Sequence, residues 1–179
     1  MKKLLLHSCC GPCSTHVINV LKNDYDITIL YYNPNIDTLE EFNHRLSEQK
    51  RYCEAVGVKV IELPYDSDEY LTAIEGLENE PEGGSRCEKC FRLRLEKTAA
   101  YAKEHGYEAF ATTLTVSPHK NSLVINRVGK EIEAETHFEF IDGNFKKQDG
   151  YKKSVELAKE FNLYRQNYCG CKFSKRKEG

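Results

Sequence analysis

Tryptophan is absent from this chain of 179 residues, and methionine occurs only once. Long apolar runs are missing as well. The N-terminal stretch "MKKLLLHSC" contains three consecutive leucines, whereas a secretory signal needs about 7–15 apolar residues and a membrane span about 18. We therefore expect a cytoplasmic protein that starts with a β-strand. The six histidines also lack the HExxH spacing of zinc hydrolases, which excludes that class of metal site.

The composition is that of a folded domain of ordinary size. Hydrophobic residues make up 40% of the chain and charged residues 30%, with 11 Gly and 5 Pro. We expect residues 1–179 to form a single catalytic domain. The net charge is only −2, but residues 144–179 hold ten Lys and Arg against four Asp and Glu. This basic segment favours contact with a polyanion such as RNA, although a solvated charged tail fits the charge equally well.

Strand and helix patterns alternate along the chain. Apolar runs predict strands at residues 3–7, 27–32, 58–63, 109–113 and 138–141. Amphipathic spacing predicts helices from Pro12 onward and at residues 39–56, 67–74, 87–105, 123–136 and 154–161. The alternation predicts a single α/β domain: a mostly parallel, Rossmann-like sheet with helices on both faces and an irregular cysteine-containing C-terminal tail. The functional loops of such sheets lie at the carboxyl ends of the strands.

Eight cysteines are the most informative feature of the composition. In a protein of a reducing compartment, clustered cysteines bind metal or carry out redox chemistry more often than they form structural disulfides. Cys10-Gly11-Pro12-Cys13 has the spacing of a thioredoxin dithiol. It follows the first strand directly and has no preceding tryptophan, however, so the thioredoxin interpretation fails.

Two groups of cysteines can together hold a metal centre. Cys9, Cys10 and Cys13 follow the first strand, and Cys87 and Cys90 form a second CxxC at the start of a helix. Four or five thiolates suffice for a tetrahedral zinc or a [4Fe–4S] cluster, and the spacing alone does not separate the two. Lys and Arg residues around the second pair can offset thiolate charge.

The remaining cysteines have different patterns. Cys169-Gly170-Cys171 is a CxC pair, which fits a labile redox pair, two metal ligands or two unrelated thiols. Cys53 shares a helical face with Leu46 and Val56, which indicates a core residue.

Five segments together resemble the cobalamin-independent, iron–sulfur epoxyqueuosine reductases. They are "HSCCGPC", "YNPNI", "SRCEKCFRLRLEKTA", "TTLTVSPHKN" and "NFKKQDGYKKSVELAKEFNLYRQNYCGCKFS". The resemblance covers residues 7 to about 174. It implies reduction of epoxyqueuosine to queuosine at the tRNA wobble position, the last step of queuosine biosynthesis.

The resemblance also implies a set of site residues. A [4Fe–4S] cluster would be held by Cys9, Cys10, Cys87 and Cys90, and Cys169 and Cys171 would form a redox-active disulfide. We further hypothesise that Cys13, together with Asp142, binds a second metal, a mononuclear iron. Asp142 is also a candidate catalytic residue, as are His119 and Lys120, by loop placement alone.

The expected partners are the tRNA anticodon stem-loop that carries epoxyqueuosine and an electron donor that the sequence does not identify. Single-stranded RNA loops are bound by aromatic stacking and basic groups. The basic C-terminal segment interleaves both kinds of residue, and its candidate substrate contacts are Lys146, Lys147, Arg165 and Tyr168.

Two alternatives remain at this point. A cluster-dependent tRNA-sulfur transferase would share the α/β domain and the CxxC pairs. Its Gly-Gly pyrophosphate loop is missing here, because "SCCGPC" occupies that place. A non-catalytic, zinc-stabilised RNA-binding module would explain the basic tail and two CxxC groups, but it leaves adjacent Cys9-Cys10 and the CxC pair without a role.

Overall fold

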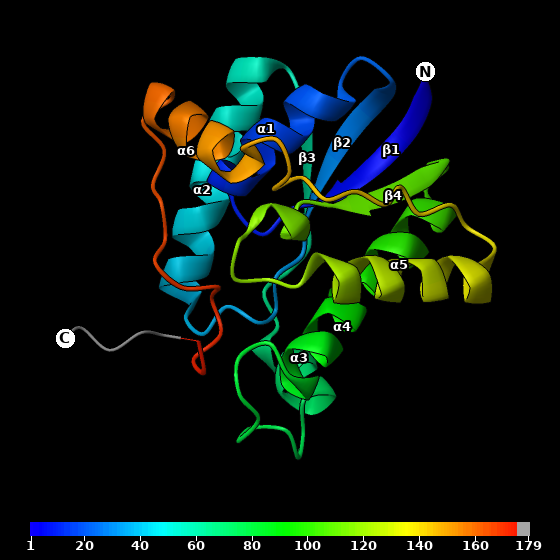
Figure 1. Cartoon of the computed structure of the whole chain (residues 1–179), viewed down its shortest axis with the longest axis vertical. Coiled ribbons are helices and arrows are strands. Elements are labelled where there is room, and N and C mark those ends of the chain that lie inside the picture. Colours follow the sequence, from blue (N-terminus) through cyan, green and yellow to red (C-terminus); the bar gives the residue numbers. More distant parts are fainter. Residues whose placement is uncertain (175–179) are drawn as a thin grey trace.

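Four parallel strands form the centre of the chain in the computed structural model, which describes residues 1–174 (Figure 1). The strands are β1 (Lys2–His7), β2 (Tyr25–Tyr31), β3 (Lys59–Glu62) and β4 (Ala109–Thr112). Their order in the sheet is β3-β2-β1-β4, and every adjacent pair is parallel. This confirms the predicted α/β sheet.

Six α-helices and one 3₁₀ helix surround the sheet within the described residues. They are α1 (Gly11–Leu21), α2 (Leu39–Val56), α3 (Ser67–Ala73), α4 (Ser85–Glu104), η1 (Leu114–Val116), α5 (Ser122–Thr136) and α6 (Gly150–Glu160). Among residues 1–174, no helix has the length and apolar character that a bilayer crossing requires.

The helices divide between the two faces of the sheet (Figure 1). On β1, Leu4 and Leu6 pack into a core cluster with residues of α1 and α6, whereas Leu5 packs into a second cluster with residues of α4 and α5. All three leucines are fully buried. Side chains of a strand point alternately to opposite faces, so a run of apolar residues is what a strand covered on both sides requires.

Helix α2 shows how local sequence sets an element. The side chain of Thr38 accepts a hydrogen bond from the Glu41 amide and caps the first turn. Gly57 ends the helix with φ of +75°, a left-handed conformation that glycine adopts without a Cβ penalty. Cys53 on this helix is fully buried, which confirms its assignment to the core.

The predicted strand at 138–141 is wrong as a full strand. Only an isolated parallel bridge, between Phe110 and Phe140, joins this segment to the sheet. The aromatic ring of Phe140 is buried against Gly129 of α5. The segment is therefore held both by this bridge to β4 and by side-chain packing on α5.

Gly129→Ala is expected to destabilise the protein by about 1–3 kcal/mol, because the added Cβ would overlap the ring of Phe140. Helix propensity alone predicts the opposite sign, since Ala is favoured over Gly in a helix by about 1 kcal/mol. Urea unfolding measures which of these two effects, steric overlap or helix propensity, is larger. Exposed Glu135→Ala on the same helix is the matched control. A stabilised Gly129→Ala variant would show that Phe140 does not pack tightly here.

Candidate cysteine-lined active site

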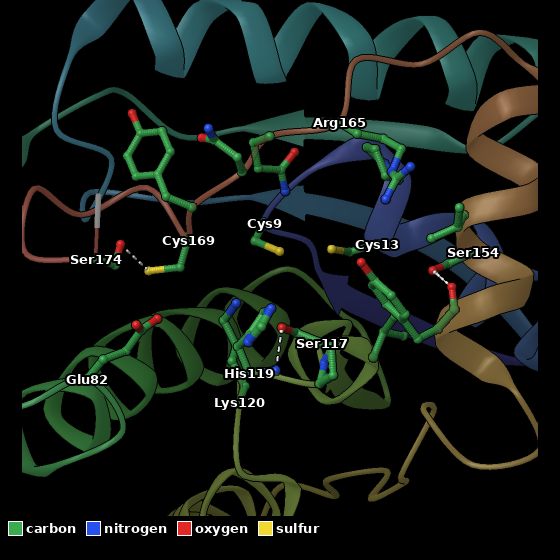
Figure 2. Close-up of a pocket in the computed structure, with 18 residues that line it drawn as sticks. Cys9, Cys13, Glu82, Ser117, His119, Lys120, Ser154, Arg165, Cys169 and Ser174 are labelled. Carbon is green, nitrogen blue, oxygen red and sulfur yellow. Dashed lines mark hydrogen bonds between the residues drawn. The ribbon is translucent and has the colours of Figure 1, made fainter. Parts of the chain in front are cut away.

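A cavity of about 460 Å³ opens at the carboxyl end of the sheet (Figure 2). Its lining comes from the loop after β1, the loop after η1, helix α6 and the C-terminal segment. The sulfur atoms of Cys9, Cys13 and Cys169 lie on one side of it, with His119 and Lys120 on the facing side. The loops that follow β1 and β4 therefore meet at this cavity.

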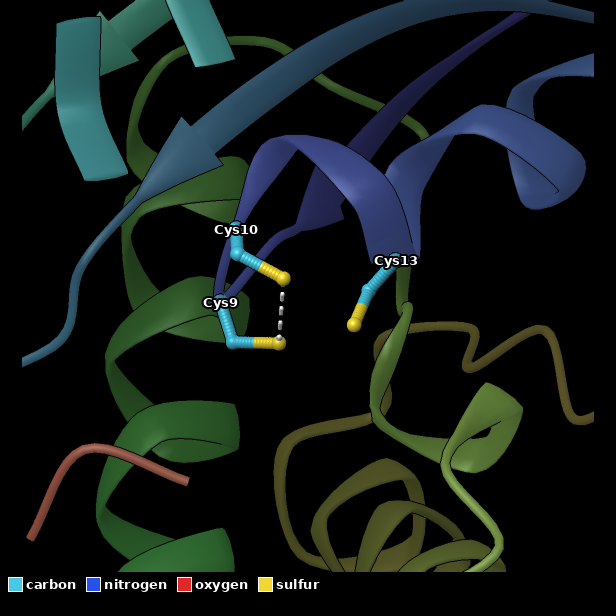
Figure 3. Close-up of side chains that lie close together, drawn as sticks. All are labelled: Cys9, Cys10 and Cys13. Carbon is cyan, nitrogen blue, oxygen red and sulfur yellow. Dashed lines mark hydrogen bonds between the residues drawn. The ribbon is translucent and has the colours of Figure 1, made fainter. Parts of the chain in front are cut away.

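Cys9, Cys10 and Cys13 form a compact thiol group (Figure 3). Their sulfur atoms all lie within 4.8 Å of one another, and those of Cys9 and Cys10 are 3.8 Å apart. Cys9 and Cys10 are buried, and Cys13 is partly exposed. A soft metal or an iron–sulfur cluster is the ligand for which such a group is suited.

The loop that carries these cysteines is held by buried polar groups. Ser8 Oγ lies 2.6 Å from Gln49 Oε1, and the side-chain amide of Asn33 donates to the Ser8 carbonyl. Gln49 Nε2 in turn donates to Ser14 Oγ of α1. The thiols are therefore presented by a rigid backbone, which is what a preorganised site needs.

Cys87 and Cys90 line an adjoining cavity that also contains Cys169 and Cys171. Glu82, His119, Lys120 and Cys169 border both cavities. Cys90 and Cys171 are buried in one small core cluster with Tyr70. The structure thus brings the two sequence-predicted cysteine groups to neighbouring cavities, with Cys169 between them.

The C-terminal segment is fixed over this site by one buried guanidinium. Arg45 of α2 donates to the carbonyls of Tyr168 and Cys169, each at 3.0 Å, and forms an ion pair with Glu41 at 2.8 Å. The Tyr168 hydroxyl donates to Asp37, whose own amide donates to the Gly170 carbonyl.

Gly170 is required at this place for two reasons. Its φ of +122° lies in the region that favours glycine, and an added Cβ would lie 3.0 Å from Ile36. The Sγ atoms of Cys169 and Cys171 lie 3.9 Å apart as free thiols. The segment is therefore anchored through its backbone, which leaves both thiols facing the cysteine cavities.

Two cations stand beside these thiols. Burial lowers the pKa of the Arg94 guanidinium, but the charges of Cys90, Cys9 and Cys169 raise it by more, so its pKa lies above the ordinary value. The same balance, with Cys169, Cys9 and Cys13 as the opposing charges, raises the pKa of Lys120. Both side chains stay charged at neutral pH and favour negative charge in the site.

The pKa values of the cysteine thiols are shifted in opposite directions. Hydrogen bonds from Cys10 and then Cys13 hold the pKa of Cys9 well below its usual range, whereas burial raises the pKa of Cys10 to about 12. A hydrogen bond from Cys171 lowers the pKa of Cys169, with Lys120 adding to the effect. Cys9 and Cys169 are thus the thiols that ionise most readily.

The other sequence-predicted residues occupy distinct places. Arg165 and Tyr168 line the cysteine cavity, whereas Asp142, Lys146 and Lys147 line a separate outer cavity. His119 borders both. His7 is fully buried, and its ring nitrogens lie within hydrogen-bond distance of Thr112 Oγ1 and the Tyr32 carbonyl. Residues 175–179 of the basic tail lie outside the described residues.

Sequence reasoning missed Arg45 and Gln49. Both lie on the buried face of α2, at helical spacing from Phe42, Leu46 and Cys53. Two polar residues on an otherwise apolar helical face are the signal that could have revealed them, because buried polar groups need specific partners.

The donor set fits an anionic iron–sulfur cluster. Arg94 is 1% exposed, and its Nε and Nη1 have no hydrogen-bond partner among residues 1–174. A buried cation needs a counter-charge, and the neighbouring groups are thiols rather than carboxylates. A cluster held by four thiolates would provide that negative charge.

Comparisons with known protein sequences all give the same family. The sequence model of one family, described as Epoxyqueuosine reductase QueH, matches residues 4–177. The chain is 40% identical to the epoxyqueuosine reductase QueH of Streptococcus pyogenes serotype M1, over 98% of this chain and 71% of that protein. It is 37% identical to the same reductase of Thermotoga maritima, over 97% of this chain and 91% of that protein.

Solved structures share the fold at low identity. A U34-tRNA thiolase NcsA from Methanococcus maripaludis, solved with its [4Fe-4S] cluster, superposes with a TM-score of 0.59 at 13% identity, over 98% of this chain and 62% of that one. A predicted subunit of tRNA methyltransferase from Methanocaldococcus jannaschii has the same TM-score at 15% identity, over 89% and 75% of the two chains.

Proposed function

The chain belongs to the epoxyqueuosine reductase QueH family, and on that basis we propose that its cysteine-lined cavity converts epoxyqueuosine to queuosine in tRNA. The observation that carries this proposal is the set of buried thiols, backed by the buried Arg94, beside a cavity large enough for a modified nucleoside. The enzyme is an oxidoreductase.

The reaction needs two electrons and two protons. They remove the epoxide oxygen as water and leave a carbon–carbon double bond. Cys169 and Cys171 supply these when two thiols become one disulfide, which releases two electrons and two protons. Their Sγ atoms lie 3.9 Å apart, so closure needs only a small local movement. An external reductant, whose identity the structure does not give, restores the thiols.

Cys9, Cys10, Cys87 and Cys90 are the proposed cluster ligands. They would hold a [4Fe–4S] cluster, which would supply one-electron redox chemistry at this place. Arg94 and Lys120 offset the thiolate charge at this place. Gln166 donates a hydrogen bond of 2.8 Å to Cys10 Sγ and so helps to orient that thiol.

Cys13 is proposed as a ligand of a second, mononuclear iron, with Asp142 as its second candidate ligand and a candidate catalytic residue. Cys13 Sγ belongs to the compact thiol group, whereas Asp142 lines the adjoining outer cavity. We expect Cys13→Ala to lose iron without an equal loss of acid-labile sulfide, and to slow turnover. Unchanged iron content and turnover, measured after anaerobic purification, would remove Cys13 from the site.

The tRNA anticodon loop is the proposed substrate, and it enters past the basic C-terminal segment. Arg165 and Tyr168 border the cysteine cavity, and half-exposed Tyr151 offers an additional aromatic surface there. Unpaired bases stack on aromatic side chains, and phosphates pair with basic groups. Lys146 and Lys147 extend the same basic surface into the outer cavity.

The proposed reaction is tested on its product. Anaerobically purified protein, a chemical reductant and tRNA that carries epoxyqueuosine are incubated together, and the nucleosides are then analysed by mass spectrometry. The expected product is queuosine, lighter than the substrate by one oxygen atom. Unchanged epoxyqueuosine, with a protein that retains its iron and sulfide, would contradict the proposed function.

A further inference from the structure

A second, outer cavity lies beside the cysteine cavity. Its volume is about 800 Å³, and the loop after η1 and the loop before α6 form its walls. Pro118, His119 and Lys120 border both cavities, so the two cavities adjoin. Within the described lining of the outer cavity there is no cysteine.

The walls of the outer cavity are held together by hydrogen bonds. Asn126 and Gly143 exchange two, from the Asn126 side-chain amide to the Gly143 carbonyl and from the Gly143 amide back to Asn126 Oδ1. Lys146 Nζ donates to the Lys120 carbonyl at 2.7 Å. These contacts join the loop before α6 to α5 and to the loop that faces the cysteines, so the shape of the cavity is set in advance.

The lining combines an apolar surface, amide groups and a positive charge. Leu123 is 80% exposed and supplies the apolar surface. Asn144 Oδ1 is buried without a hydrogen-bond partner among residues 1–174. Lys147 is exposed and forms no ion pair among the same residues.

We propose that the outer cavity is a nucleotide subsite, which binds the nucleotide next to the modified one in the single-stranded loop. The inference rests on the proposed function, because it assumes that the modified nucleoside occupies the cysteine cavity. Lys147 pairs with the neighbouring phosphate, the base lies over Leu123, and Asn144 Oδ1 accepts a hydrogen bond from it. The shared residues 118–120 let one continuous strand occupy both cavities.

Direct binding measurements test this subsite. The ligands are an RNA stem-loop that carries epoxyqueuosine and the free epoxyqueuosine nucleoside. We expect Lys147→Glu to weaken stem-loop binding about tenfold and to lower the ratio of stem-loop to nucleoside affinity by a similar factor. The slope of log K against log salt should become shallower by about 0.7, the value for one phosphate contact on a single strand. Leu123→Ser should weaken stem-loop binding with no change in that slope.

Lys22→Glu is the matched control, since it makes the same charge change at the far end of α1. Its stem-loop affinity should equal that of the unchanged protein, and all variants should melt at the same temperature. Equal stem-loop affinity of Lys147→Glu and Lys22→Glu would overturn the subsite, even if the enzyme converts its substrate. Failure of the unchanged protein to convert epoxyqueuosine, with Lys147→Glu still selectively weak in stem-loop binding, would instead contradict the proposed function.

Discussion

Cys169→Ser is expected to abolish multiple turnover while the iron and sulfide content stays unchanged. A hydroxyl cannot form a disulfide with Cys171, so the two-electron store is lost, whereas the proposed cluster ligands are untouched. The backbone anchor of this residue should persist, because Arg45 binds the carbonyls of Tyr168 and Cys169 rather than the side chain. The measurement is product formed per enzyme with excess stem-loop substrate.

The control for this variant is Cys53→Ala, which removes a buried thiol of α2 that lines neither of the two cysteine cavities. It should keep both its iron and its turnover. Loss of iron from Cys169→Ser would make Cys169 a metal ligand, and normal multiple turnover would show that electrons reach the substrate without this pair.

Cys9→Ala is expected to lose the bound iron and sulfide, and with them all detectable conversion. Cys9 is buried, and its sulfur lies within 4.8 Å of the sulfur atoms of Cys10 and Cys13. Its removal takes away one of the four proposed cluster ligands and leaves the buried Arg94 with less counter-charge. We also expect a lower melting temperature than that of Cys53→Ala.

Iron, sulfide and absorbance spectra of the anaerobically purified Cys9→Ala protein check this expectation. A variant that keeps its full iron and sulfide would exclude Cys9 from the ligand set. In that case Cys13, the remaining thiol of the compact group, would be the alternative partner of Cys10.

Sequence periodicity predicted most elements because their boundaries have local causes. Helix 39–56 is such a case: Thr38 caps one end and left-handed Gly57 closes the other. The sequence predicts a helix at 154–161, whereas α6 begins four residues earlier, at Gly150, where the close Phe145 carbonyl leaves no room for a Cβ. The apolar residues at 138–141 predicted a strand, but the segment pairs with β4 through a single bridge, while the Phe140 ring packs on α5.

The sequence predicts the cysteines of the candidate site but not the residues that hold its loops in place. Clustered cysteines are visible in the sequence, and the order of the strands brings their loops to one edge of the sheet. Arg45 lies 124 positions from Cys169, so no local pattern connects them. Likewise, Asp142 follows the expected segment yet lines the outer cavity, since the loop before α6 is tied to Asn126 rather than turned toward the thiols.

The metal bound by the cysteines, and the presence or absence of sulfide, distinguish iron–sulfur chemistry from its alternatives. A zinc-stabilised RNA-binding module would use the same cysteines without sulfide. A tRNA-sulfur transferase would need a place for ATP after β1, where Gly11 packs against the backbone of Glu48 and the loop is filled by cysteines.

The most direct test is to count iron, zinc and acid-labile sulfide per chain after anaerobic purification, without reconstitution. We expect about four sulfides per chain, at least as much iron and no zinc, with iron in excess if Cys13 binds a second metal. Stoichiometric zinc without sulfide would contradict an iron–sulfur site and favour the RNA-binding module.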